Sequence, residues 1–392
     1  MNIFKDLKVT ENVSEQIAIG KEISETYTEA NFKQIYSYFD KVNNWEEKYD
    51  LTKEEMLYKS IYDNWVYGFR PEQQFWYDLP HKTHEEKKTF MSQMEDFVYY
   101  ARLNRKKDML MFEDKYETYK LFKPYYKREV IKLSSEDDYD LFLDFISRHP
   151  KFVMKPLGLH DTAGVQLVDS DEYEDKKQLF HKILYIGQDY VDDYTYMWCN
   201  HNSAVLEEVI QMSEEFGKFN PKALHVVRVP TIRAKGKVTV FGAYLKIGVT
   251  DDLIVGESRT GSVISAADCA TGKLITDGHY ENGDCISVHP TSKIPFKGYQ
   301  IPDWQDMVDI ATKLVSELPP YVNYIAWDFV HTPKGWVIVE GNFYGQSLWQ
   351  MCFQRGMKKE FEELIGWHMD ENKFWWQYKT KQVEKEAGLY DF

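Results

Sequence analysis

Cysteine and long apolar runs are scarce in this chain. The four cysteines, Cys199, Cys269, Cys285 and Cys352, lie far apart and form no CxxC pair, so neither a disulfide framework nor a zinc site is indicated. No stretch has the apolar length of a membrane-spanning helix. The first residues, MNIFKDLKVTENVSEQ, carry charges where a signal peptide has its apolar core. We therefore expect a soluble protein of the reducing cytoplasm.

Positive charge is also in short supply. The chain has 48 Lys and Arg against 63 Asp and Glu, which gives a net charge of -15. Binding to a nucleic-acid backbone relies on a surface rich in Lys and Arg, so we expect no nucleic-acid partner. An anionic nucleotide would need its own local cluster of lysines and backbone amides. The motifs GxxxxGK[ST], GxGxxG, HRD with DFG, HExxH and GxSxG are absent too, which leaves little support for a hydrolase.

The composition that remains is that of a folded protein with more than one domain. The chain has 392 residues, of which 43% are hydrophobic and 16% aromatic, and this is enough for two or more domains with cores. The predicted division is a helical domain over 1–110, a lobe over 111–202, a second lobe over 203–370 and a polar, loose tail over 371–392.

Helical signals fill the N-terminal region. Thr52 precedes one amphipathic segment, and Thr83 with Glu86 forms a capping box ahead of another, in which Phe90, Met94, Phe97 and Tyr100 recur at helical spacing. We interpret this aromatic stripe as core packing. Beyond residue 110 the pattern predicts strands at 128–133, 151–158, 164–168, 203–211, 223–233, 237–249 and 253–258, and helices at 114–126, 303–318 and 347–366.

The segment YIAWDFVHTPKGWVIVEGN, residues 324–342, carries oxygen ligands inside two apolar strands. Its HTPKG centre predicts a tight turn and hence a β-hairpin, which sets Asp328 nearly opposite Glu340. Glu340 and Asn342 share one face, which Asp328 joins across the strands. Two carboxylates so close repel, so we expect a positive charge between them, and Mg²⁺ fits. The alternative is an exposed hairpin whose polar residues face water.

A second informative stretch is FVMKPLGLHDTAGVQLV, residues 152–168. Lys155 stands near the end of an apolar strand, and the loop that follows contains Gly158, Thr162, Ala163 and Gly164. Such a loop can lay backbone N–H groups over phosphate oxygens while the lysine supplies a point charge. Taken alone, this stretch slightly favours an ordinary hairpin with a solvated lysine.

Order and spacing make the combination more informative than its parts. Lys115, Lys155 with its glycine loop, the LEEVI segment and the late D…E-x-N set together resemble the ATP-grasp superfamily over residues 110–366. The chain is most similar to the sugar-transfer-associated ATP-grasp proteins, through NPKALHVVRVPTIR, ADCATGKL and IAWDFV. The resemblance implies an α+β ATP-grasp fold, with ATP between two lobes, plus a helical N-terminal domain. It also implies that two lysines, Lys115 and Lys155, contact phosphates under the loop, that Glu207, Glu208, Val209 and Ile210 recognise adenine, and that Asp328, Glu340 and Asn342 hold Mg²⁺.

Several positions depart from the family pattern. The chain has His225-Val226 where relatives have Asn-Thr, Lys246 where they have Arg, and Glu257-Ser258 and Gly261-Ser262 where they have Asp-Asn and Gly-Gly. At position 246 the lysine offers a single point charge where an arginine would offer a bidentate guanidinium, so the two residues bind anions differently. The sequence therefore supports the site for the triphosphate of ATP better than the site for the substrate that accepts the phosphoryl group.

The resemblance implies an ADP-forming ligase that uses ATP and Mg²⁺ to activate a carboxylate as an acyl phosphate, which an amine then converts to an amide. Arg228 and Lys246 are the predicted catalytic cations. His289 is a further candidate, although a lone histidine is more often structural. Bacterial surface polysaccharide is the predicted setting. A kinase for a sugar hydroxyl and a nucleotide-binding module without turnover remain alternatives.

Overall fold

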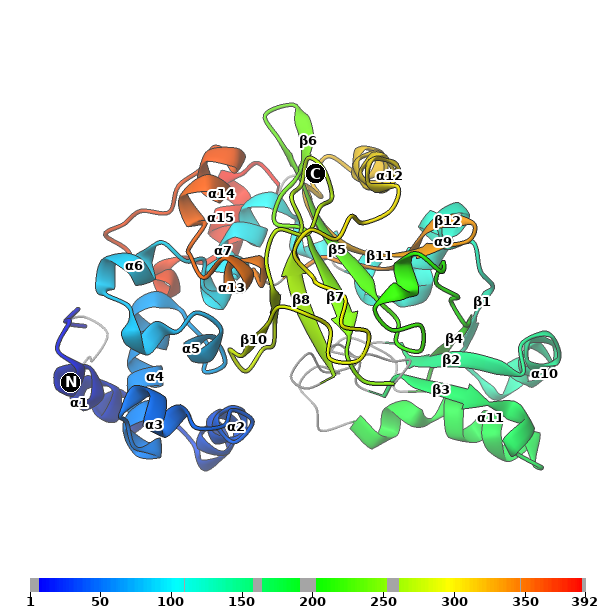
Figure 1. The fold of residues 1–392 in the computed structure, drawn as a ribbon, viewed down its shortest axis with the longest axis horizontal. Helices are drawn as coiled ribbons and strands as arrows, with labels where there is room; N and C mark the ends of the chain where they lie inside the picture. The colour runs from blue at the N-terminus through cyan, green and yellow to red at the C-terminus, as the bar shows by residue number, and fades with distance from the viewer. Residues whose placement is uncertain are drawn as a thin grey trace.

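The computed structural model describes residues 7–108, 110–157, 164–190, 202–251, 261–345 and 347–389. Its N-terminal part is helical, as predicted, and lies on the left of Figure 1. The helices there are α1 (Val13–Ser24), α2 (Glu29–Phe39), α3 (Trp45–Tyr49), α4 (Lys53–Tyr67), α5 (Gln73–Trp76), α6 (His84–Lys88) and α7 (Gln93–Leu103). Within the described ranges no helix combines the length and the apolar character that crossing a bilayer requires.

Side-chain caps determine where these helices begin. Thr52 caps α4, and Thr83 with Glu86 forms the predicted capping box of α6. The segment after Thr83 is nevertheless two helices, because Ser92 forms a new capping box and starts α7. Phe97 on α7 is 37% exposed. The prediction of one continuous stripe of core aromatics is therefore wrong at Phe97.

A first sheet follows the helices α8 (Leu110–Glu113) and α9 (Lys115–Tyr126). It contains four strands in the order β1-β4-β2-β3, each antiparallel to its neighbours. The strands are β1 (Val130–Leu133), β2 (Lys151–Pro156), β3 (Gln166–Asp169) and β4 (Ala204–Glu208). Helices α10 (Tyr139–Arg148) and α11 (Lys176–Leu184) pack on it through Phe142, Phe145 and Phe180, and this lobe lies on the right of Figure 1.

A larger antiparallel sheet occupies the centre of the molecule, with the order β10-β9-β8-β7-β5-β11-β12 and β6 paired to β5. Its strands are β5 (Val226–Ala234), β6 (Lys237–Val240), β7 (Tyr244–Gly248), β8 (Ser262–Ala266), β9 (Gly278–His279), β10 (Cys285–Ile286), β11 (Tyr324–Thr332) and β12 (Gly335–Asn342). The strand predicted at 253–258 lies outside the described residues.

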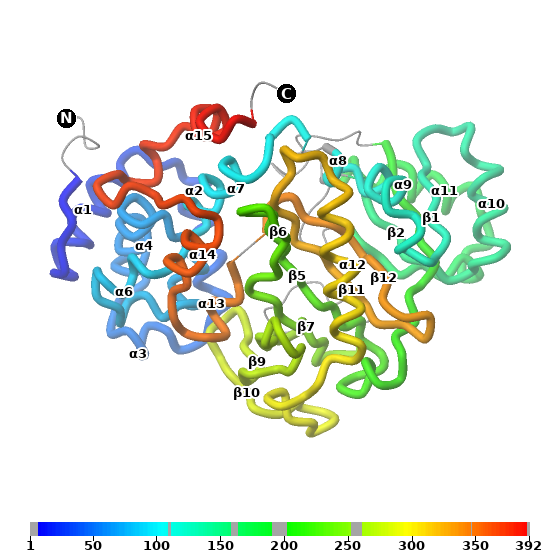
Figure 2. Tube along the Cα trace, turned by 90° about the horizontal axis from the view of Figure 1, so that it is seen from above, coloured from blue at the N-terminus to red at the C-terminus, as the bar shows by residue number. Residues whose placement is uncertain are grey.

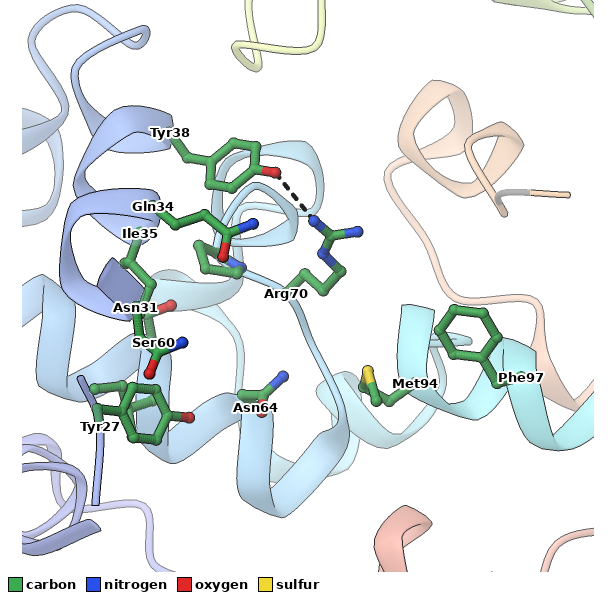
Figure 3. A pocket seen from close by; sticks show the side chains of 12 residues that line it. Tyr27, Asn31, Gln34, Ile35, Tyr38, Ser60, Asn64, Arg70, Met94 and Phe97 are labelled. Carbon is green, nitrogen blue, oxygen red and sulfur yellow. Dashed lines mark hydrogen bonds between the residues drawn. The ribbon is translucent and has the colours of Figure 1, made fainter. Parts of the chain in front are cut away.

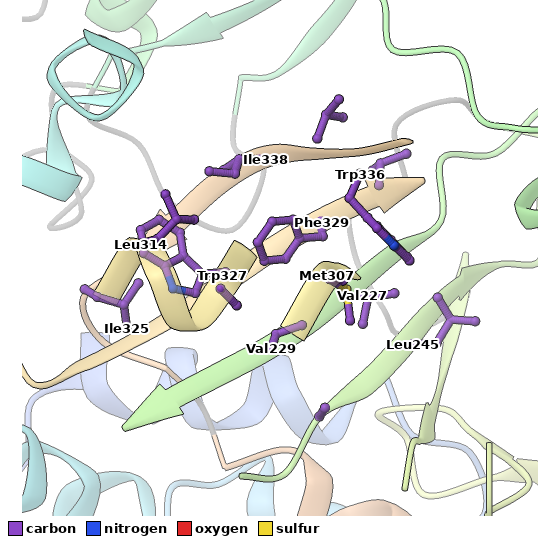
Figure 4. Packing of buried hydrophobic residues seen from close by; sticks show 14 of the residues in the cluster. Val227, Val229, Leu245, Met307, Leu314, Ile325, Trp327, Phe329, Trp336 and Ile338 are labelled. Carbon is purple, nitrogen blue, oxygen red and sulfur yellow. The ribbon is translucent and has the colours of Figure 1, made fainter. Parts of the chain in front are cut away.

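The two faces of the large sheet have different neighbours. Val227, Leu245 and Trp327 point to one face and are buried in the same cluster as Met307 and Leu314 of helix α12 (Trp304–Glu317), as Figure 4 shows. Since side chains alternate along a strand, the residues next to these three point to the opposite face. That second face carries both an apolar region and the polar residues of the candidate site.

The apolar region of the second face is covered by helices from both ends of the chain. Tyr244, Ile264 and Tyr324 share a buried cluster with Trp349 and with side chains of α4 and α7. Figure 2 shows the C-terminal helices, in orange and red, lying on the N-terminal ones, in blue. The two ends of the chain thus form one packed unit against the sheet.

The C-terminal region corrects two sequence predictions. The helix predicted at 347–366 is broken into α13 (Trp349–Phe353) and α14 (Lys358–Ile365). At Gly356 a Cβ atom would stand 2.1 Å from the backbone of Thr89, so the chain approaches α6 too closely for a side chain here. The tail is not loose: α15 (Thr380–Glu386) packs beside α7 and buries Val383.

Candidate functional site

The hairpin of β11 and β12 brings the three predicted oxygen-bearing side chains together. Asp328 pairs with Glu340 and Ala326 with Asn342, and a β-bulge follows Asp328. The amide nitrogen of Asn342 lies 3.5 Å from a carboxylate oxygen of Asp328 and 3.5 Å from one of Glu340. The convergence expected from the turn and from strand alternation is therefore present.

The direct cationic partner of Asp328 is Arg228 on the neighbouring strand β5. The two residues are register partners, and the guanidinium donates from Nε to one carboxylate oxygen and from Nη2 to the other, the latter at 2.9 Å. This is a bidentate, charge-assisted pair in a largely buried position. A protein cation thus supplies part of the compensation that the sequence argument assigned to a metal.

Burial and neighbouring charges shift the two carboxylates in opposite directions. Burial raises the pKa of Asp328 to about 6, and Glu340 adds to this rise, while Arg228 and Lys246 oppose it. Burial would also raise the pKa of Glu340, but the charges of Lys115 and Lys155 hold it below its ordinary value. The two lysines chosen from the sequence therefore lie within electrostatic reach of the hairpin.

Lys155 is not a solvated lysine. Its side chain is 11% exposed, and its Nζ lies 2.8 Å from Oε1 of Glu207 on the adjacent strand β4. The other oxygen of Glu207 accepts hydrogen bonds from Nη2 and Nε of Arg128, at 2.6 and 2.9 Å. Burial would raise the pKa of Glu207, but the charges of Arg128 and Lys155 lower it to about 2. Glu207 therefore anchors two cations through its carboxylate.

Arg128 is the residue that sequence reasoning missed. Besides Glu207 it donates from Nη1 to the carbonyl oxygen of Ile338 on β12, at 2.6 Å, and so connects the small sheet to the large one. Its guanidinium stacks over the ring of Tyr126, 4.6 Å from the centroid. The available signal was an arginine two residues before strand β1, and its partner Glu207 is 79 residues away.

The other residues predicted for the nucleotide are placed unevenly. Gly158, Thr162 and Ala163 lie outside the described residues, and Gly164 has a φ of 70°, a conformation suited to glycine. Lys115 is the first residue of α9. Glu208 ends β4, where its carboxylate accepts the backbone N–H of Glu129, and Val209 and Ile210 follow it.

His289 has a structural environment. Its Nε2 lies 3.1 Å from the carbonyl oxygen of Gly248, and its Nδ1 accepts the backbone N–H groups of Thr291 and Ser292. Both ring nitrogens are thus engaged by backbone. His225 is likewise buried, and burial lowers its pKa to about 3. Of the other departures from the family pattern, Glu257 and Ser258 lie outside the described residues.

Two carboxylates and one amide form the possible metal site. Among the described residues there is no group of three or more His, Cys, Asp and Glu that could hold a metal. Asp328, Glu340 and Asn342 do suit Mg²⁺, which is usually bound by one or two carboxylates together with substrate phosphates. The nearby lysines and arginine suit those phosphates. The arrangement can therefore hold a metal-bound polyphosphate.

Comparison with known proteins was made for sequence and for structure. A model of the family described as sugar-transfer associated ATP-grasp matches residues 94–364. No curated protein matches the chain. Among solved structures, D-alanine-D-alanine ligase from Helicobacter pylori is 14% identical, with 66% of this chain and 62% of that chain covered and a TM-score of 0.37. L-amino acid ligase from Bacillus licheniformis is 14% identical, with 64% and 50% covered and a TM-score of 0.35. The chain thus spans less than two thirds of these two structures.

Proposed function

Because this chain belongs to the sugar-transfer associated ATP-grasp family, we propose that it is an ADP-forming ligase that joins a carboxylate to an amine with ATP and Mg²⁺. Family membership confirms the predicted α+β ATP-grasp fold with its helical N-terminal region. The observation that carries the proposal is the set of cations around the carboxylates of Asp328 and Glu340. Lys115, Lys155, Arg228 and Lys246 all act electrostatically on Asp328 or Glu340.

The small sheet would hold the phosphates of ATP. Lys155 is kept in place by Glu207 at 2.8 Å, so its ammonium group is already positioned before a phosphate binds. Lys115 adds a second charge, and the loop from Gly158 to Gly164, with Thr162 and Ala163, would cover the triphosphate and exclude water.

The end of β4 would hold the adenine base. Glu208, Val209 and Ile210 follow one another at this strand end. The backbone N–H of Glu208 donates to the carbonyl oxygen of Glu129, so the backbone groups of Val209 and Ile210 would contact the planar base. The carboxylate of Glu207 is committed to Lys155 and Arg128. Glu207 thus contributes to nucleotide binding through Lys155 and not through its own contact with adenine.

Asp328, Glu340 and Asn342 would bind Mg²⁺, which neutralises phosphate charge when bound. Arg228 and Lys246 are placed on the same face of the sheet and would stabilise charge that develops on the transferred phosphoryl group. Both ring nitrogens of His289 are hydrogen-bonded to backbone. We therefore propose that His289 stabilises its loop and takes no part in proton transfer.

The proposed reaction has two steps. A carboxylate oxygen of the first substrate attacks the γ-phosphorus, the bond from that phosphorus to the bridging oxygen breaks, and ADP leaves. The amine of the second substrate then attacks the acyl carbon, loses a proton and displaces inorganic phosphate, which yields the amide. We propose bacterial surface polysaccharide as the setting, with an amidated sugar acid as one possible product, and the description of the family as sugar-transfer associated supports this setting.

Trapping with hydroxylamine tests this reaction. The chain is incubated with ATP, Mg²⁺, hydroxylamine and a panel of sugar acids and amino acids, and a hydroxamate with ADP and phosphate is the expected result. The Glu340→Gln variant, purified in parallel, should form none. A stable phosphate ester with ADP would identify a kinase instead. Thermal stabilisation by Mg-ATP without ADP would identify a binding module, and AMP with pyrophosphate would contradict the acyl phosphate.

A further inference from the structure

A cavity lies in the N-terminal helical region, and none of the residues of the candidate site lines it. Its volume is about 370 Å³, near the lower end of the range of small-molecule pockets, roughly 300–1,000 Å³. Figure 3 shows it from close by. It is lined by Tyr27, Asn31, Gln34, Ile35, Tyr38, Ser60, Ile61, Asn64, Arg70, Pro71, Met94 and Phe97.

Helical spacing produces this lining. Asn31, Gln34 and Tyr38 recur at helical spacing along one side of α2, next to the buried Ile35. Asn31 and Gln34 are exposed, so they form the rim of the cavity. Ile61 and Asn64 come from one side of α4, and the third helix, α7, completes the wall. These exposed amides make the rim of the cavity on the α2 side polar.

The two sides of the cavity differ in polarity. Figure 3 shows Met94 and Phe97 on α7 opposite the side chains of α2. Phe97 is one of the large apolar side chains that stay exposed, at 37%, and its ring offers a flat apolar surface. The cavity thus has one apolar wall and one wall rich in amides and hydroxyls.

The side-chain amides of Asn64 and Gln34 can form hydrogen bonds with a ligand in the cavity. Asn64 donates from Nδ2 to the carbonyl oxygen of Phe69 at 2.9 Å, which leaves its amide oxygen as an acceptor. The side chain of Gln34 makes no hydrogen bond within the described part of the chain. A primary amide can donate and accept, and so can the hydroxyl group of a ligand.

Charge at the cavity is balanced within the protein. Arg70 donates from Nη2 to the hydroxyl of Tyr38 at 3.0 Å, and its Nε lies 3.1 Å from a carboxylate oxygen of Glu72. The guanidinium is therefore paired with an anion two residues along the chain. Because the charge of Arg70 is balanced, an anionic ligand is disfavoured. The hydrogen-bonding groups of the lining would then determine which ligand binds.

We infer that this cavity binds a neutral, polyhydroxylated ring, that is, a sugar. A sugar ring combines hydroxyl groups on its rim with apolar C–H surfaces on its faces, which matches the amides of one wall and the Phe97 ring of the other. The inference goes beyond the ligase reaction and does not depend on it. Phe97 also contacts Tyr344, with ring centroids 5.7 Å apart, and Tyr344 follows Asn342 closely in the chain.

Direct binding measurements on the full chain, without ATP, test the inference. The probes are D-glucose, D-galactose, N-acetyl-D-glucosamine and inorganic phosphate, followed by saturation-transfer NMR and calorimetric titration. At least one sugar should bind, and Gln34→Leu should weaken its binding roughly three- to tenfold, the effect of one neutral hydrogen bond. Gln305→Leu, at an exposed glutamine of α12 that does not line the cavity, should bind like the wild type.

Other outcomes would overturn the inference. If none of the sugars binds, or if both leucine variants bind sugar equally well, the cavity does not recognise hydroxyl groups. Binding of phosphate with no binding of sugar would indicate an anion site at Arg70. The Gln34→Leu variant should bind Mg-ATP with the affinity of the wild type. Because sugar binding is measured without ATP, the result does not depend on whether the chain is a ligase.

Discussion

Glu207, which pairs with both Lys155 and Arg128, gives the sharpest test of the site. Glu207 is buried and holds both Lys155 and Arg128 through its carboxylate. Glu207→Gln keeps the shape of the side chain but removes its charge, so two buried cations lose their common anion. Removing one partner of a buried ion pair costs about 3–5 kcal/mol.

The pKa of Glu207 gives a second value for its contribution to the free energy of unfolding, and it also predicts how that contribution changes with pH. An ordinary glutamate has a pKa of about 4.3, and lowering it to about 2 corresponds to about 3 kcal/mol of stability. Because the folded pKa is depressed, this contribution is fully present above about pH 4.3 and is lost as the pH falls towards 2. Both arguments thus give a loss of about 3 kcal/mol for Glu207→Gln at neutral pH.

Calorimetric melting over a pH series measures both quantities. At pH 7 the Glu207→Gln variant should melt roughly 6 °C below the wild type, and the gap should narrow as the pH falls from 5 to 3. Glu208→Gln is the matched control, since Glu208 points to the other face of β4 and accepts one backbone N–H. An unchanged melting temperature, or a gap that does not vary with pH, would refute the ion-pair reasoning.

Three further predictions concern other charged groups. Lys155→Ala should weaken Mg-ATP binding by about 2 kcal/mol in calorimetric titration, whereas the exposed lysine control Lys151→Ala should not; equal affinities would remove Lys155 from the site. Asp328→Asn should abolish ADP release and also lower the melting temperature, because Arg228 loses its bidentate partner; full turnover would exclude a metal ligand. Asp63→Asn should cost about 3–5 kcal/mol in chemical denaturation, because the buried Asp63 lies 2.9 Å from each of two buried lysines; a change below about 1 kcal/mol would contradict this.

Local sequence determined the hairpin and the helix starts. The turn at HTPKG and strand alternation are enough to bring Asp328 opposite Glu340, because both strands are adjacent in the chain. The caps at Thr52 and Thr83 are equally local, since each joins residues three positions apart. Such features follow from neighbours along the chain and do not depend on the rest of the fold.

The charge partners were decided by tertiary structure. Arg228 reaches Asp328 across 100 residues, and Arg128 reaches Glu207 across 79; both contacts exist only because β5 lies beside β11 and β1 beside β4. Sheet order depends on how distant strands share a core, and one sequence does not reveal it. For this reason the sequence argument placed a metal where Arg228 supplies part of the charge.

Tertiary packing also decided the C-terminal region and the N-terminal cavity. The amphipathic pattern over 347–366 predicted one helix, but α13 ends at Phe353, where Gln354 has a φ of 49°, and Gly356 then lies close to the backbone of Thr89. The polar tail gains its helix α15 by docking Val383 against the partner helix α7. The cavity combines side chains of α2, α4 and α7. Periodicity within each helix indicates which side chains share a face but not which other helix that face will lie near.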